Sequence, residues 1–208
     1  MAIVVHHLNN SRSQRILWLL EELGAEYDIR SYKRDAETNL APPELASVHP
    51  LGKSPVIEDD GLLIAESGAI VQWLCERHGG ENWLPDPQSD NHASYLEWMQ
   101  FAEGSVIVPI MLRLYTSRLG EAGAPLQDRI DSQLGAHFGY MDDALAQTGH
   151  FVGDDWTAAD VMLSFPAEIA VMQGMGERFE NLSAFVEAVH ARPAWKLARE
   201  RGGPYFGW

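Results

Sequence analysis

Residues 49–74 read HPLGKSPVIEDDGLLIAESGAIVQWL and combine a rigid turn, a hairpin and the start of a helix. Two short runs, Val56-Ile57-Glu58 and Leu62-Leu63-Ile64, flank an Asp-Asp-Gly turn, which is typical of a tight β-hairpin. Lys53-Ser54-Pro55 places a cation and a rigid turn before the first run. Glu66-Ser67 then opens a helix, whose free backbone N–H groups attract an anion. The stretch therefore predicts a site for a small peptide that carries carboxylates.

The residues before this stretch alternate between strand and helix signals. Hydrophobic periodicity and turn residues predict a strand over 2–8, a helix over 12–23, a strand over 27–32 and a short helix over 42–48. With the hairpin and a helix over 66–78, the order is βαβαββα. That order is typical of a thioredoxin-like α/β domain, which we place at residues 1–80.

The rest of the chain reads as helical. A Pro/Gly-rich polar segment over 79–87 predicts a linker. An all-α C-terminal domain over 88–208 is expected to contain helices near 90–117, 125–148, 158–174, 179–190 and 193–201. Thr157 and Asp160 have the spacing of a capping box, which predicts a structural helix start there.

Composition excludes several classes of protein. The formal net charge is −15, which opposes nucleic-acid binding. No apolar run is long enough to span a membrane and no signal peptide is evident, so we expect a cytoplasmic protein. Cys75 is the single cysteine; it lies among apolar residues, and we expect it to be buried rather than reactive. No metal-ligand motif is predicted.

The motifs resemble those of the glutathione transferase family. In that family an N-P-x-G-K-V-P segment, a hairpin and an E-S dipeptide hold glutathione; here they read HPLGKSP at 49–55 and Glu66-Ser67. The resemblance covers the whole chain and implies the glutathione transferase fold, a thioredoxin-like domain followed by an all-helical one. The segment SRSQRILWLLEEL at 11–23 is similar to a fungal and bacterial subgroup.

The resemblance also implies how glutathione would be held. Lys53 would meet the glycine carboxylate, and a cis Pro55 would let the backbone of Ser54 pair with the cysteinyl residue. Glu66 and Ser67 would bind the γ-glutamyl ammonium and carboxylate. Asn39 is a candidate for a further carboxylate contact, with Lys33 or Arg34 as alternatives.

Ser11 and Asn10 compete for the catalytic role. A serine at a helix start is either an N-cap or a hydrogen-bond donor to the glutathione thiolate. Serine-type transferases resemble this chain in placing a serine four residues before an arginine, as in Ser11 and Arg15. Some bacterial relatives have a cysteine where Asn10 stands, and the Asn10 amide can donate to sulfur but cannot form a disulfide. Both assignments stay open.

The resemblance implies a homodimer that conjugates the glutathione thiolate, as co-substrate, to small hydrophobic electrophiles in detoxification. The electrophile pocket would lie between the domains, with Tyr115, Met111 and Trp98 as candidate lining residues. Two other functions remain possible on the sequence. One is glutathione-dependent disulfide or peroxide reduction without a protein cysteine, and the other is a non-catalytic interaction module.

Overall fold

The structure is a computed structural model that describes residues 2–206. The chain forms two compact units. One combines the chain up to Leu84 with the chain from Val189 onward, and the other runs from Pro85 to Ala188.

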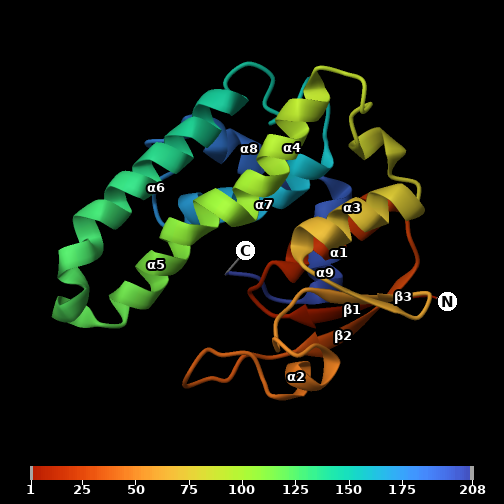
Figure 1. The fold of residues 1–208 in the computed structure, drawn as a ribbon, viewed down its shortest axis with the longest axis horizontal. Coiled ribbons are helices and arrows are strands. Elements are labelled where there is room, and N and C mark those ends of the chain that lie inside the picture. The colour runs from red at the N-terminus through yellow and green to blue at the C-terminus, as the bar shows by residue number, and fades with distance from the viewer. Residues whose placement is uncertain (1, 207–208) are drawn as a thin grey trace. The chain divides into compact units, whose positions relative to one another are not determined.

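The first unit is built on a four-stranded sheet (Figure 1). Its strands β1 (Ile3–Leu8), β2 (Tyr27–Tyr32), β3 (Val56–Asp59) and β4 (Leu62–Ala65) lie in the order β2-β1-β3-β4. β1 and β2 are parallel, whereas β3 is antiparallel to both β1 and β4. The helices are α1 (Ser13–Leu23), α2 (Glu44–Val48) and α3 (Ser67–Arg77), so the predicted βαβαββα order is confirmed.

Helix α1 provides much of the core of this unit. Five consecutive residues, 16–20, are fully buried, and the helix ends at Gly24 in the left-handed conformation with φ 62°. α1 and α3 lie on one face of the sheet, while α2 lies on the other side (Figure 1). Burial of these large apolar side chains is a favourable contribution to folding of the unit.

The topology brings four loops to one end of the sheet. β1 and β2 run parallel, so both of their C-terminal ends lie there. His6 near the end of β1 is paired with Val56 at the start of β3, and Val56 is paired with Ala65 at the end of β4. The segments that follow β1, follow β2, precede β3 and follow β4 are therefore neighbours.

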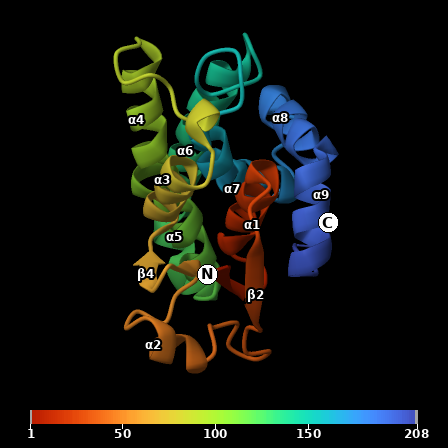
Figure 2. The ribbon, with the colours of Figure 1, turned by 90° about the vertical axis from the view of Figure 1, so that its right-hand side faces the viewer.

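The C-terminal helix α9 (Pro193–Gly202) packs on α1 within the same unit, as Figure 2 shows. The guanidinium of Arg192 is bonded to Glu22, and that of Arg201 donates to Glu21 and to the carbonyl of Tyr27. The sequence predicts one helical domain over 88–208; in the structure, the described residues from Val189 onward group with the first compact unit. The physical reason is the pairing of basic residues after α8 with acidic residues at the end of α1.

The second unit is helical in its secondary structure. Its main elements are α4 (Asn91–Phe101), η2 (Ala102–Val106), α5 (Ile107–Ser117), α6 (Ala124–Leu145), α7 (Ala158–Met172) and the start of α8 (Glu180–Ala191). The predicted helix over 90–117 is interrupted by η2, one turn of π-helix. No helix within residues 2–206 is long and apolar enough to cross a membrane.

Helix α7 is the buried centre of the second unit, and the capping box predicted at its start is present. The Asp160 carboxylate accepts hydrogen bonds from the backbone N–H of Phe151 and Thr157 and from the Thr157 hydroxyl. All thirteen residues from Ala158 to Ala170 are buried. Thr157 and Asp160 are therefore structural residues.

Candidate functional site

The turn before β3 is anchored to β1 by a serine side chain. The peptide bond between Ser54 and Pro55 is cis, as expected. The Ser54 hydroxyl donates to the carbonyl of His6 at 2.8 Å and accepts from the backbone N–H of Leu8 at 3.2 Å. Ser54 itself precedes β3, which begins at Val56, so its side chain rather than its backbone holds the turn against β1.

Glu66 and Ser67 lie opposite this turn. The pairing of Val56 with Ala65 places the residue before β3 and the residue after β4 side by side. Ser67 is buried at the first position of α3, with the N–H groups of that helix start around it. Glu66 is exposed and has φ 69° and ψ 120°, a conformation that costs a non-glycine residue about 1–3 kcal/mol. Strain of this kind is concentrated at binding sites.

Arg34 joins the loop after β2 to the loop after β1. Its guanidinium donates to the carbonyls of Asn9, Asn10 and Asn39 at 3.1 Å each. Burial, together with the nearby charge of Arg12, lowers the pKa of Arg34 from its usual value. The guanidinium donates to backbone carbonyls, so Arg34 connects the two loops. It is therefore not assigned the alternative role of binding a carboxylate of glutathione.

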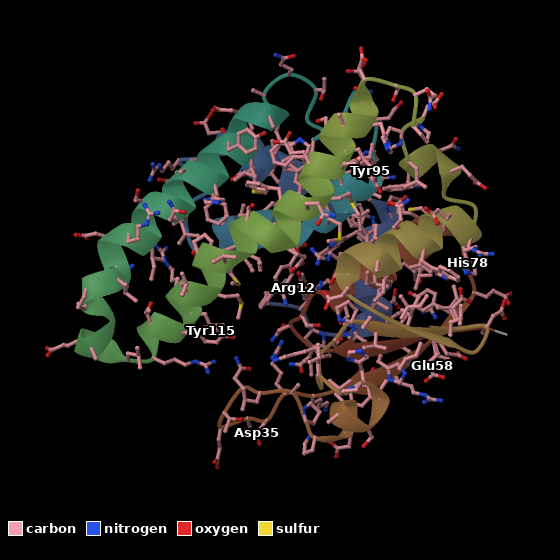
Figure 3. All side chains as sticks on the ribbon, viewed as in Figure 1. Arg12, Asp35, Glu58, His78, Tyr95 and Tyr115 are labelled. Atoms are coloured by element: carbon pink, nitrogen blue, oxygen red, sulfur yellow. The ribbon has the colours of Figure 1, made fainter. Side chains whose placement is uncertain are left out.

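The two remaining predicted glutathione contacts, Lys53 and Asn39, are exposed at this end of the sheet. Asn39 has φ 58° and closes the loop that begins at Asp35, which Figure 3 labels. Its backbone N–H donates to the carbonyl of Asp35 at 2.9 Å. The Asp35 carboxylate accepts three further bonds in the loop, which hold its pKa below the usual value.

Ser11 is buried, with 5% of its surface exposed, just before α1. Its oxygen accepts a hydrogen bond from the backbone N–H of Ser13 at 3.2 Å, as a capping side chain does. The same oxygen lies 2.7 Å from the hydroxyl oxygen of Ser13. Arg12, labelled in Figure 3, is the residue between them and the last before the helix.

A buried histidine lies behind the two serines. The Ser13 hydroxyl oxygen is 2.8 Å from His7 Nδ1, and His7 Nε2 is 3.1 Å from the carbonyl oxygen of Gly202 in α9. Burial lowers the pKa of His7 to about 4, although the bond to Gly202 opposes this shift. His7 is therefore neutral at physiological pH.

Both the backbone and the side chain of Asn10 have a defined conformation. Its backbone adopts φ 50°, a left-handed conformation that asparagine tolerates better than most residues. Its side-chain oxygen Oδ1 accepts a hydrogen bond of 2.7 Å from the backbone N–H of Phe206. The sequence pointed to Asn10 but carried no signal for its partner Phe206, which is 196 positions away.

Cys75 is fully buried in α3, as expected. Burial and the neighbouring Glu76 raise the pKa of its thiol to about 12. The thiolate is the reactive form of cysteine, so Cys75 is unsuited to redox or nucleophilic chemistry.

The three predicted electrophile contacts lie in the second unit and differ in exposure. Trp98 on α4 is 4% exposed, and its ring stacks on Tyr140 and contacts Phe101 and Phe151. This packing places Trp98 in the core of its unit. Met111 is partly buried on α5, whereas Tyr115, near the end of that helix in Figure 3, is 55% exposed.

A thioredoxin-like sheet with a cis-proline turn, followed by a helical unit, defines the class of this protein, and comparison with known proteins agrees. Residues 2–76 match the family model described as glutathione S-transferase, N-terminal domain, and residues 112–197 match that described as glutathione S-transferase, C-terminal domain.

Relatives match over most of the chain. Glutathione S-transferase 3 of Schizosaccharomyces pombe is 32% identical over 96% of this chain and 87% of its own. Glutathione S-transferase 1 of Saccharomyces cerevisiae is 28% identical over 96% of this chain and 94% of its own. The crystal structure of a glutathione S-transferase from Actinobacillus pleuropneumoniae has a TM-score of 0.89 at 32% identity, covering 98% of this chain and 94% of that one. The chain belongs to the glutathione S-transferase family.

Proposed function

We propose that this protein is a cytoplasmic glutathione transferase that binds glutathione at the loop end of the sheet and transfers its thiolate to small hydrophobic electrophiles. The observation that carries the proposal is the convergence of Asn10-Ser11, Ser54 and Glu66-Ser67, which the strand pairing brings to one place. These segments offer amide and hydroxyl donors beside the start of a helix, an arrangement suited to a small anionic peptide.

Glutathione is held along its length by these groups. The backbone of Ser54 pairs with the cysteinyl residue as an added strand does. Ser67 and the N–H groups at the start of α3 bind the γ-glutamyl carboxylate, and Glu66 accepts from the γ-glutamyl ammonium. Lys53, with Asn39 nearby on the second loop, binds the glycine carboxylate.

The protein contributes to the reaction by activating the glutathione thiol and by binding the two reactants close together. A free thiol has a pKa of about 8.5, so only about 3% is ionised at pH 7. A side-chain donor from one of the two candidates, Asn10 or Ser11, together with the start of α1, favours the thiolate. The thiolate attacks an electrophilic carbon and a C–S bond forms; in substitution the leaving group departs with its electron pair, and in addition the resulting carbanion takes a proton from water. Binding both reactants avoids the cost of their encounter.

The electrophile is bound by apolar side chains of α5. Tyr115 and Met111 are the proposed contacts, and the Tyr115 hydroxyl can donate to a polar group of the electrophile. Trp98 lies in the core of the same unit, where its ring packs on Phe101 and Tyr140. The broad apolar surface of α5 favours a range of substrates.

Conjugation of glutathione to 1-chloro-2,4-dinitrobenzene tests the proposal. Lys53→Met should lower kcat/KM for glutathione about tenfold, as expected for losing a charge-assisted hydrogen bond. Lys196→Met removes another exposed lysine, on α9 and outside the proposed site, and should leave kcat/KM unchanged. Equal loss in both variants, or no rate above the uncatalysed reaction in the parent protein, would contradict the proposal.

A second candidate function is glutathione-dependent reduction of a disulfide or peroxide. The burial of Cys75 supports a version of this activity in which glutathione alone supplies the thiols. One glutathione thiolate attacks the substrate disulfide and displaces one substrate thiolate, which leaves a mixed disulfide. A second glutathione thiolate attacks the glutathione sulfur of this mixed disulfide and displaces the other substrate thiolate, giving oxidised glutathione. Turnover of a mixed disulfide of glutathione and 2-mercaptoethanol without turnover of the chloroarene would favour this activity.

We also propose a homodimer. Large apolar side chains are exposed on both units, among them Leu62 and Leu63 on β4 and Leu96 and Val108 in the second unit. Exposed apolar surface of this kind marks interaction sites. Light scattering should give twice the 23.2 kDa mass of the chain, and a mass of one chain at micromolar concentration would contradict the dimer.

A further inference from the structure

We propose that the C-terminal segment Gly202–Phe206 positions the thiol-activating groups: through His7 and Ser13 it fixes Ser11 as a hydrogen-bond acceptor, and through the backbone of Phe206 it fixes Asn10 as the donor to the thiolate. This inference rests on the proposed function and decides between the two candidates for the catalytic donor.

The hydrogen-bond partners of His7 define its tautomer. A backbone carbonyl can only accept, so the contact of 3.1 Å with Gly202 requires the proton of His7 to be on Nε2. His7 is 3% exposed and neutral, because burial lowers its pKa to about 4. Nδ1 therefore carries a lone pair and must accept.

The lone pair on His7 Nδ1 determines the direction of the hydrogen bonds made by Ser13 and Ser11. Ser13 has one hydroxyl hydrogen and two acceptors near it, the Leu8 carbonyl at 3.3 Å and His7 Nδ1 at 2.8 Å. The shorter contact uses the hydrogen, because two facing lone pairs would otherwise repel at 2.8 Å. The contact of 2.7 Å between the two serine oxygens then needs its hydrogen from Ser11. Ser11 thus donates inward to Ser13, while its oxygen also accepts from the Ser13 backbone N–H. Only a lone pair of Ser11 is left for a ligand, and a lone pair stabilises the thiol rather than the thiolate.

The bond from Phe206 fixes the orientation of the side-chain amide of Asn10. A backbone N–H can only donate, so the bond of 2.7 Å from Phe206 identifies the amide oxygen and directs Nδ2 away from the C-terminal segment. Within residues 2–206 Nδ2 has no hydrogen-bond partner. The Arg34 guanidinium holds the backbone carbonyl of Asn10 at 3.1 Å, so the loop as well as the side chain is fixed. Asn10 therefore presents two N–H hydrogens and Ser11 none.

The thiol pKa of bound glutathione, followed by thiolate absorbance at 240 nm, separates the roles. Asn10→Ala should raise the thiol pKa by about one unit, the effect of one donor to a charged group. Ser11→Ala should not raise it. Ser13→Ala removes the acceptor of the Ser11 hydroxyl, which can then turn to the sulfur; it should lower the thiol pKa, and Ser11→Ala added to Ser13→Ala should abolish that decrease.

A change of one backbone atom tests the C-terminal segment. Phenyllactic acid in place of Phe206 replaces the N–H by an ester oxygen, which repels Oδ1 of Asn10. The thiol pKa should rise about as much as in Asn10→Ala, by about one unit. Phe206→Ala keeps the N–H and should leave the thiol pKa unchanged. An unaltered pKa in the ester protein would overturn the role of the segment.

Nitrogen chemical shifts of His7 give a readout without glutathione. The expected result is the Nε2–H tautomer in the parent protein at pH 7. An Nδ1–H tautomer, or a thiol pKa that depends on Ser11 and not on Asn10, would overturn the inference while leaving a glutathione transferase. A parent protein that binds no glutathione would overturn the proposed function and this inference together.

Discussion

At the scale of single residues, the candidate site contains residues with uncommon backbone conformations. Asn10, Asn39 and Glu66 all have positive φ, and all three lie in the loops at the same end of the sheet. Hydrogen bonds to nearby residues hold Asn10 and Asn39 in these conformations, and Glu66 lies directly between β4 and α3. The proposed binding role of Glu66 explains why glutamate rather than glycine occupies a position that glycine would adopt with less strain.

Glu66→Gly should therefore separate stability from binding. Glycine relieves a strain of about 1–3 kcal/mol and loses about 0.5–1 kcal/mol to its greater freedom in the unfolded chain, so the variant should be more stable by about 1 kcal/mol. Affinity for glutathione should fall, because the acceptor for the γ-glutamyl ammonium is gone. Urea unfolding and calorimetric titration measure the two effects. Glu66→Gln, which keeps the strain, should weaken binding without gaining stability; a gain in stability there would contradict this reading.

At the scale of elements, the turn before β3 depends on the Ser54 side chain. Its hydroxyl completes the hydrogen bonding of β1 where the strand pairing has ended. Ser54→Ala leaves the buried N–H of Leu8 without an acceptor and should cost about 1–3 kcal/mol. Hydrogen exchange of the Leu8 amide should accelerate in Ser54→Ala and stay slow in Ser54→Thr, which retains a hydroxyl. Equal protection of that amide in the alanine variant would show that the side chain does not hold the turn.

The contact between α9 and α1 is close at Gly202. A β-carbon added there would lie 2.7 Å from Leu17 Cδ1, 3.0 Å from Gln14 Oε1 and 3.3 Å from His7 Nε2. Gly202→Ala should therefore separate the end of α9 from α1 at a cost of about 1–3 kcal/mol and expose α9 amides to exchange. Gly104→Ala is the matched control, since a β-carbon there meets nothing within 4 Å. Similar exchange of α9 in both variants would contradict the tight packing.

At the scale of the whole molecule, acid should destabilise the protein through His7. Its folded pKa of about 4 lies below the ordinary 6.5, so between these values the unfolded chain binds the extra proton. The contribution of His7, roughly 3 kcal/mol, is fully present above pH 6.5 and is lost as the pH falls to about 4. Urea unfolding at pH 7.5 and 4.5 should show this loss in the parent and a smaller one in His7→Gln. Asp59, whose pKa is lowered from 3.8, titrates below this window.

A structural feature can be predicted from the sequence when neighbouring residues determine it, and not when residues far apart in the chain do. The hairpin, the start of α7 at Thr157 and the buried face of α1 are set by neighbouring residues, so periodicity and turn chemistry predict them. The family resemblance supplied the cis turn at Pro55. Ser11 and Asn10 are candidates that the sequence predicts, but their hydrogen-bond directions cannot be predicted from it, because His7 and Gly202 are 195 positions apart in the chain.

A pH titration of the thiolate absorbance of glutathione bound to the parent protein tests directly whether the protein activates the thiol. Free thiol ionises near pH 8.5. A transferase that activates glutathione through the loop end of its sheet should shift the midpoint down by about two units, equivalent to about 2.7 kcal/mol from several oriented donors. Saturable binding with a midpoint unchanged from that of free glutathione would contradict activation of the thiol by this site.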